Sequence, residues 1–369
     1  MVKQFILLKQ FTQNSNKGFT LLELLVTLVV ASVITGLALK LIVDQRQLFL
    51  NDQSRTQVNQ NLRASLDLVG TDIKQAGERL TTSTLPVVRV IDGASGASDE
   101  LVLQRLVIAE TLPVCQTVTS GNTNPIVVSS KAIASGICSF SDGNGNTLPD
   151  NLDQWKDSRC NIIPVTKPNC TRTTNINRAT VSNRCDEEKD GTDKECLWAY
   201  IYDPVNKVGE FFVYGFESPN ATNNIYRVHR VDSGSWQNTY TYAAASATNP
   251  ILYILEQRRY QLVPNGSPGS TDKVLQLTLN NQTSSDFLVD NQTSPIRLVN
   301  QLSNFQVKAL MQDDTEEDGF NDTAPPSDDW KQLKAIKIDV TAINPAPNST
   351  KVPNLTVSAR FFPRNVSSK

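Results

Sequence analysis

Glu23 is the side chain whose surroundings most restrict its chemistry. It is the only acid in an apolar run from Phe19 to Val43. A carboxylate near membrane hydrocarbon is strongly unfavourable unless a cation pairs with it. Cleavage after Gly18 would create such a cation, the α-amino group of Phe19, at nearly the same depth. We therefore expect Glu23 to pair with this amine, its own or a neighbouring subunit's. The alternative is an ordinary anchor whose glutamate reaches the headgroups.

The residues on either side of Gly18 differ sharply in character. Residues 1–18 carry basic side chains and no acid, so they form a leader. Residues 19–43 are apolar, long enough for a helix to cross a hydrocarbon layer of roughly 30 Å. Lysines before this run and few after it place the N-terminus in the cytoplasm and the rest of the chain outside. An ordinary secretory signal has its small residue after the apolar run. Here Gly18 precedes the run, so the helix stays attached after cleavage.

The segment Lys17–Leu25, KGFTLLELL, resembles the cleavage and methylation motif of type IV prepilins. The resemblance implies that a prepilin peptidase cuts between Gly18 and Phe19 and methylates the new amine. It also implies that Glu23 helps to dock the subunit on other pilins, major and minor, at an inner-membrane assembly platform. The protein would first be a single-pass protein of the bacterial inner membrane. It would then enter a pilus or pseudopilus, in the periplasm or at the cell surface.

A second, one-sided helical pattern follows the apolar run. Over residues 44–77, apolar side chains recur at spacings of three and four, which predicts an amphipathic helix: Val58, Leu62, Leu66, Val69, Ile73 and Ala76. Gly77 is predicted to be the C-cap of this helix. The two halves together predict one helix from Phe19 to Ala76. We expect a sheet to cover the apolar stripe of its second half.

Residues 78–369 predict an extracytoplasmic domain rich in strands. Alternating or β-branched runs predict ten strands: Pro86–Ile91, Glu100–Ile108, Leu197–Tyr202, Glu210–Phe216, Ile225–Val231, Ile251–Leu262, Val274–Leu279, Phe305–Met311, Ala335–Ile343 and Leu355–Phe362. Segments rich in Gly, Pro, Asn and Ser separate them. The fold class is therefore α+β. The resemblance above implies the type IV pilin fold, in which antiparallel sheet packs on the long helix.

Residues 142–196 are predicted to form a loop insertion that is polar, rich in cysteine and poor in strand signals. The chain has six cysteines: Cys115, Cys138, Cys160, Cys170, Cys185 and Cys196. They form no CxxC pair and the single histidine, His229, is remote, so a zinc site is not expected. An even number in a loop-rich segment favours disulfides made outside the cytoplasm. Six cysteines allow fifteen pairings, and free thiols remain an alternative.

Residues 142–153 have the spacing of a calcium-binding loop. Oxygen ligands at positions 1, 3, 5, 9 and 12, with a carbonyl at position 7, suit a cation that takes six to eight oxygens: Asp142, Asn144, Asn146, Leu148, Asp150 and Asp153. Thr147 replaces the usual turn glycine and Asp153 the usual glutamate. A plain Asn-Gly turn explains the same residues, so no cofactor is required. The acidic run 313–318 is a second calcium candidate, and a solvated loop is its alternative.

Two other function classes have little support. The net charge is −2 with a pI near 5.6, and Lys and Arg are spread along the chain. Nucleic-acid binding needs a clustered basic face, so it is not expected. The chain contains no Gly-rich phosphate loop, nucleophile elbow or HExxH helix. Its only imidazole, His229, lies in a strand-like segment. We expect no catalytic residue and no enzyme.

Three short segments resemble particular pilin subfamilies. Asp72–Gly77 resembles the end of the long helix in PilW-like minor pilins. Trp330 with Leu333–Ile338 resembles a late strand shared by PilW-like pilins and the J-type pseudopilins of type II secretion. The closing Phe362–Asn365 resembles a minor-pilin C-terminus.

The function predicted is that of a minor pilin of a type IV pilus, assembled through its N-terminal helix and priming or capping the filament tip. A pseudopilin that exports protein or polysaccharide would use the same helix. A third hypothesis is a tip adhesin or DNA-uptake module that makes contact through residues 142–196. A simple anchored envelope protein would keep its N-terminus uncut.

Overall fold

The computed structural model describes residues 20–80, 85–141, 143, 149–155, 197–220, 225–230, 234–244, 248–266, 270–279, 295–321, 330–343 and 354–364. Within these residues one long helix, α1 (Leu21–Gln75), precedes two antiparallel sheets. The chain divides into two compact units, Met1–Thr56 and Gln57–Lys369. The first unit is described only by its stretch of α1. Both sheets belong to the second unit.

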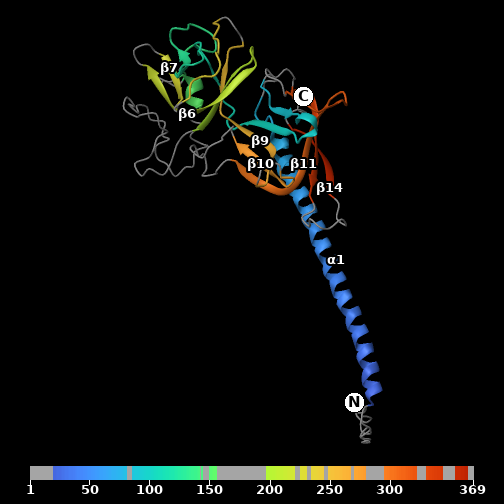
Figure 1. Cartoon of the computed structure of the whole chain (residues 1–369). Helices are drawn as coiled ribbons and strands as arrows, with labels where there is room; N and C mark the ends of the chain where they lie inside the picture. The colour runs from blue at the N-terminus through green and yellow to red at the C-terminus, as the bar shows by residue number, and fades with distance from the viewer. Residues whose placement is uncertain are drawn as a thin grey trace, which may run out of the picture. The chain divides into compact units, whose positions relative to one another are not determined.

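The larger sheet has eight strands and receives the last turns of α1. Its order is β1 (Val88–Ile91), β2 (Glu100–Leu106), β9 (Leu255–Pro264), β10 (Lys273–Leu279), β11 (Ile296–Met311), β13 (Leu333–Ala342) and β14 (Leu355–Phe361), with β12 (Glu316–Glu317) paired to β11. Every pairing in it is antiparallel. Figure 1 shows these strands curving around the C-terminal part of α1.

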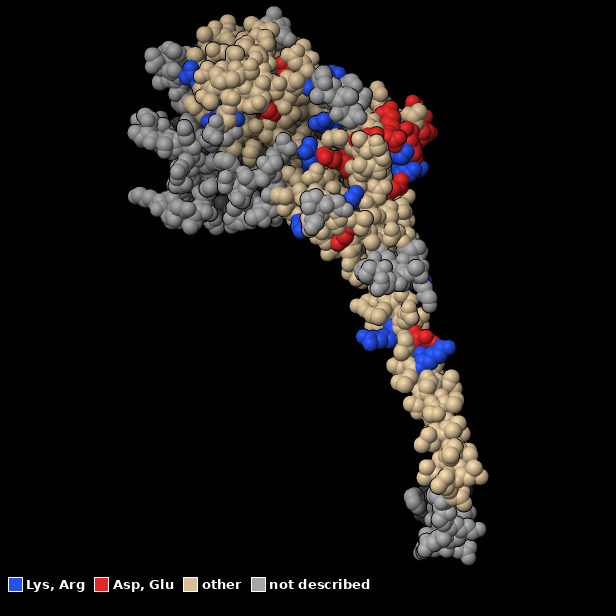
Figure 2. All heavy atoms as spheres, viewed as in Figure 1, with Lys and Arg blue, Asp and Glu red and all other residues tan. Residues whose placement is uncertain are grey.

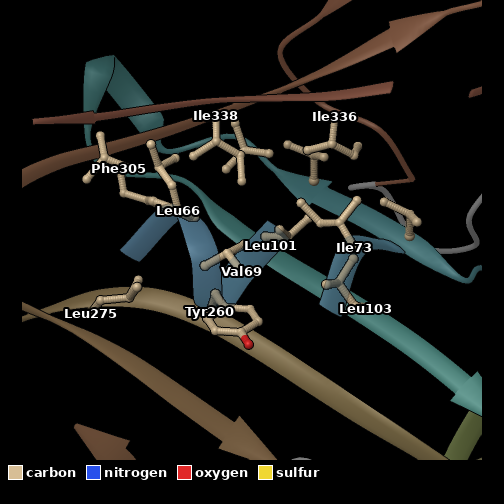
Figure 3. Packing of buried hydrophobic residues seen from close by; sticks show 14 of the residues in the cluster. Leu66, Val69, Ile73, Leu101, Leu103, Tyr260, Leu275, Phe305, Ile336 and Ile338 are labelled. Atoms are coloured by element: carbon tan, nitrogen blue, oxygen red, sulfur yellow. The ribbon is translucent and has the colours of Figure 1, made fainter. Parts of the chain in front are cut away.

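The stripe predicted on the second half of the helix is buried against this sheet. All six of its residues, Val58, Leu62, Leu66, Val69, Ile73 and Ala76, lie in one hydrophobic core. Phe305, Ile336 and Ile338 face the helix from the sheet (Figure 3). Burying an aliphatic side chain of this size contributes about 1.5–3 kcal/mol. The prediction that a sheet covers this stripe is confirmed.

The helix ends where a side chain no longer fits. Gly77 has a φ of +72°, a left-handed conformation that glycine adopts at no steric cost. Its N–H donates to the carbonyl of Gln104 on β2, at 2.9 Å. A Cβ at Gly77 would lie 2.7 Å from Cη2 of Trp330. The C-cap predicted at Gly77 is therefore also the point where the helix meets the sheet.

The smaller sheet has six strands and a core of its own. Its order is β3 (Leu112–Pro113), β8 (Ile251–Tyr253), β5 (Leu197–Asp203), β6 (Val208–Asn220), β7 (Ile225–Arg230) and β4 (Ile126–Ser130). Trp155, Trp236, Phe212 and Tyr240 are fully buried in this core. Residues 143 and 149–155 are the described part of the predicted insertion, and Leu152 and Trp155 from it belong to this core.

The edge strand β4 is covered by residues from both sides of it in the sequence, Cys115 before it and Cys138 after it. All five β4 residues are buried although β4 has only one strand neighbour. The carbonyl of Val127 accepts the N–H of Cys115 at 2.7 Å, and the N–H of Ser130 donates to the carbonyl of Cys138 at 3.1 Å. A disulfide joins Cys115 to Cys138. An uncovered strand edge invites pairing with other chains, and this closure removes that edge.

All ten predicted strands are present, although Ile251–Leu262 is divided between β8 and β9. The pattern missed β3, β4, β12 and residues 296–304 of β11. A long apolar N-terminal helix, antiparallel sheets and the Cys115–Cys138 disulfide are consistent with a pilin-like α+β fold.

Candidate functional site

The first turn of α1 is capped by Thr20. Its Oγ1 accepts the N–H of Glu23 at 3.2 Å, and its carbonyl accepts the N–H of Leu24 at 3.1 Å. These bonds satisfy backbone groups that a helix start leaves unpaired. The same cap places Glu23 in the first turn, where the helix dipole favours a negative charge.

The surface of α1 around and beyond Glu23 is apolar. Most of its large side chains are more than half exposed, from Leu21 at 83% to Phe49 at 68%. The hydroxyls of Thr27, Ser32 and Thr35 donate to carbonyls one turn earlier, at 2.7–2.9 Å. They are therefore satisfied without water or a partner. By length and composition α1 qualifies as a membrane-crossing helix.

The Glu23 carboxylate differs from these hydroxyls. Among the residues that the structure describes, none hydrogen-bonds or pairs with it, and the side chain lies on an exposed turn. Its predicted partner, the amine of Phe19, lies outside the described residues, as does the cleavage-site residue Gly18. The pairing of Glu23 with an N-terminal amine stays a prediction. Because the cap at Thr20 sets the start of the helix, that pairing would occur at its first turn.

A polar network, which the sequence did not predict, fastens the other end of α1 to the sheet. Arg258 Nη1 on β9 lies 2.7 Å from both carboxylate oxygens of Asp72. Tyr260 also donates its hydroxyl to Asp72, and burial followed by the charge of Asp72 raises the pKa of Tyr260. On the neighbouring strand, Arg105 donates to Glu256 at 2.7 Å and to Gln75 of the helix. Each of these contacts joins residues far apart in the sequence.

Burial and hydrogen bonding oppose each other at Glu256. Burial by itself raises the pKa of this carboxyl, whereas hydrogen bonds and charge from Arg105 and Arg258 outweigh burial and hold the pKa below its usual range. Glu256 therefore stays ionised between two guanidinium groups. The network holds the last turn of α1 against β2 and β9.

The structure shows one disulfide, a pairing that the sequence had left open. Cys115 and Cys138 form a disulfide with a Cα–Cα separation of 5.5 Å. The other four cysteines, Cys160, Cys170, Cys185 and Cys196, lie outside the described residues.

The predicted calcium loop is described only in part. Asp142, Asn144, Asn146 and Leu148 lie outside the described residues. The Asp150 carboxylate accepts the Gly143 N–H at 2.9 Å and the Ser141 hydroxyl at 3.0 Å, so it closes the loop. In the described part of the chain, no three His, Cys, Asp or Glu side chains converge as metal ligands would. Calcium binding at residues 142–153 stays a prediction.

The acidic run 313–318 meets basic side chains of the larger sheet. Lys308 pairs with Asp318 at 2.7 Å, Lys337 with Glu316 at 3.2 Å, and Lys334 with Asp314. Figure 2 shows acidic and basic atoms intermingled on this surface. The hydrogen bond from Lys308 to Asp318 raises the pKa of that lysine. These contacts favour the solvated, ion-paired loop over the calcium alternative.

Comparison with known proteins identifies one segment. A family model described as the prokaryotic N-terminal methylation motif matches residues 13–39. No curated protein and no solved structure matches the chain. The motif supports a type IV prepilin-like protein, that is, a pilin-like or pseudopilin-like subunit. It implies processing by a prepilin peptidase and assembly with pilins in a membrane system.

Proposed function

We propose that this chain is a minor pilin of the PilW-like kind, built into a type IV pilus through α1. The observation that carries the proposal is the methylation motif at residues 13–39, which ends in an exposed apolar helix whose first turn holds Glu23. Prepilin peptidase would remove residues 1–18 and methylate Phe19. The single-pass precursor would wait in the inner membrane with its N-terminus in the cytoplasm.

Assembly would depend on a difference between the Glu23 carboxylate, which needs a partner, and the other polar side chains of the apolar part of α1, which do not. The hydroxyls of Thr27, Ser32 and Thr35 are satisfied inside the helix. An unpaired carboxylate is unfavourable in hydrocarbon, so Glu23 gains the most from an amine on a neighbouring subunit. This difference would favour packing of the helix at one depth against its neighbour. An ectodomain with two sheets is bulky to repeat along a thin fibre, which favours a place at or near the tip.

The proposal is tested at the mature N-terminus and in the filament. Mass spectrometry of the extracted protein should find N-methylphenylalanine at residue 19. Glu23→Gln should reduce incorporation into purified filaments at least tenfold, because it removes the charge and keeps the size. Ser32→Ala is the matched control, since the Ser32 hydroxyl bonds within the helix at 2.7 Å, and it should incorporate normally. An uncut leader, or normal incorporation of Glu23→Gln, would contradict the proposal.

A pseudopilin of a type II-like secretion system is the second candidate, because the same motif serves both machines. Deletion of the gene separates them. Loss of surface pili with secretion intact supports the pilus, and loss of secretion with pili intact supports the pseudopilus.

A further inference from the structure

The smaller sheet is inserted between two strands of the larger one. β2 and β9 are direct neighbours, paired from Leu101 with Tyr260 to Leu106 with Leu255. The N–H of Val107 donates to the carbonyl of Ile254 at 2.9 Å, just past the last pair. Residues 107–254 therefore leave the larger sheet and return to it at adjacent positions, as the loop of a hairpin does.

The two hydrophobic cores share no residue. The core that buries α1 is built from residues 58–103 and 260–342. The core of the smaller sheet is built only from residues 108–254. The strands divide in the same way, since β3–β8 form one sheet and β1, β2 and β9–β14 form the other.

Several polar contacts are internal to each part, and one hydrogen bond, from the Arg79 guanidinium to the carbonyl of Val107, joins the two parts. The network on α1 uses Asp72, Arg258 and Tyr260, all outside 107–254. Within 107–254, the Glu210 carboxylate accepts the Gln237 N–H and the Tyr240 hydroxyl, both at 2.9 Å. The Cys115–Cys138 disulfide lies in the same segment.

One apolar cluster joins the two parts. Leu85, Leu106 and Leu255 come from the side of the larger sheet, and they pack in a buried cluster with tyrosines of the smaller sheet: Tyr200, Tyr202 and Tyr253. This cluster lies where the chain passes between the sheets, because Leu106 and Leu255 are the last paired residues of β2 and β9. Leu80 packs against both this cluster and the core on α1, so the cluster connects the insert to the larger sheet through apolar contacts.

We infer that residues 107–254 are an inserted module that assembly does not need, and that α1 with the larger sheet forms a complete assembly domain. The inference rests on the assembly function proposed above. The module is a much longer segment than the insertion expected at residues 142–196. Loop insertions of this kind are tolerated when the two ends lie close together.

The first test shortens the chain. Residues 107–254 are replaced by Asn-Gly, which forms a two-residue hairpin turn between paired strands. Incorporation into purified filaments is then measured by immunoblot in cells lacking the native gene. We expect the shortened chain to be incorporated within about twofold of the full chain. The inference alone would be overturned if the full chain is incorporated into filaments but the shortened chain, although cut and methylated, is not. Absence of the full chain itself would overturn the proposed function and this inference together.

The second test keeps the full length, in case the shortened chain does not fold. Phe212→Ala removes a fully buried ring from the core of the smaller sheet, and Phe305→Ala removes one from the core on α1. Hydrogen exchange should show lost protection in β5–β8 for Phe212→Ala, with β11 and β13 unchanged and incorporation retained. Phe305→Ala should instead lower protection in β11 and β13, leave β5–β8 unchanged and abolish incorporation. Loss of protection in both sheets from Phe212→Ala would overturn the inference.

Discussion

Arg258 reaches from β9 to the last turns of α1, where its Nη1 lies 2.7 Å from both carboxylate oxygens of Asp72. The Asp72 side chain is only 8% exposed and that of Arg258 is 27% exposed. The apolar stripe holds the helix against the sheet, and the close fit of Gly77 against Trp330 limits how the helix can move. The charge-assisted contact of one guanidinium nitrogen with both carboxylate oxygens adds a directional constraint at the same end of the helix.

Arg258→Met should lower the free energy of unfolding by about 2–4 kcal/mol, because it leaves Asp72 as a largely buried charge. Denaturant unfolding of the detergent-solubilised chain measures the loss. Lys334→Met is the control, since the Lys334–Asp314 pair is exposed, and exposed pairs contribute about 0–1 kcal/mol. Equal losses in the two variants would show that the Arg258–Asp72 pair is no more than a surface contact.

Gly70→Ala should destabilise the chain by about 1 kcal/mol or more, although alanine is the better helix former by about 1 kcal/mol. A Cβ at Gly70 would lie 2.1 Å from Cε1 of Phe361 on β14, so the ring must move. In a Phe361→Ala background, the same substitution should instead stabilise. Gly36→Ala is the control, because nothing lies within 4 Å of its added Cβ. An unchanged sign in the Phe361→Ala background would rule out this contact as the cause.

Acid should destabilise the chain through His229. Burial, followed by the charge of Arg227, lowers the pKa of His229 to about 4. The unfolded chain therefore binds a proton near pH 6.5 that the native chain does not accept until about pH 4. The stability contribution is full above about pH 6.5 and falls as the pH drops through this window, by up to about 2 kcal/mol between about pH 7 and pH 5. Urea midpoints at these two pH values should differ less for His229→Gln, and an identical difference would refute the assignment.

Calcium should raise the melting temperature if residues 142–153 bind it, because a ligand that binds only the native state stabilises that state. Thermal unfolding in millimolar calcium and in chelator measures the effect. Asp150→Asn keeps an oxygen that can accept the Gly143 N–H and removes the negative charge. This variant should lose the calcium-dependent increase. Identical melting curves for the unsubstituted chain with and without calcium would contradict the prediction that residues 142–153 bind calcium.

Loss of the Cys115–Cys138 disulfide should destabilise the smaller sheet. The bond closes a loop with a sequence separation of 23, and a loop of that length contributes about 3 kcal/mol in the chain-entropy account. Paired Cys115→Ser and Cys138→Ser substitutions should lower hydrogen-exchange protection in β4 and β7 first. Equal loss in β11 and β13 would show that the two sheets unfold together.

The helix could be predicted closely because its signals are local. The stripe from Val58 to Ala76 has helical spacing, and the glycine at its end takes a positive φ. Residues 296–304 of β11 were missed because polar side chains interrupt the alternation there. Gln301 has a φ of +61° and the pairing with β13 shifts between Leu302 and Asn304. A local irregularity of this kind has no periodic signal.

The division into two sheets could not be predicted from the same signals. Strands of both sheets have the same two-residue period, so the period does not say which strands pair. The contact between Asp72 and Arg258 joins residues 186 positions apart, and no local pattern encodes it. Glu23 could be singled out as a candidate site residue because a charge in an apolar run is conspicuous without any structure.

The covered edge of β4 has a consequence for the order of events in the cell. The two residues that cover this edge, Cys115 and Cys138, are joined by a covalent bond that forms only under oxidising conditions. If the ectodomain is exported as proposed, only backbone hydrogen bonds hold Cys115 and Cys138 against β4 in a newly translocated chain until their thiols are oxidised. Thiol oxidation would then control the supply of subunits that can assemble. Cells that lack the oxidising enzymes should accumulate aggregated precursors rather than short filaments.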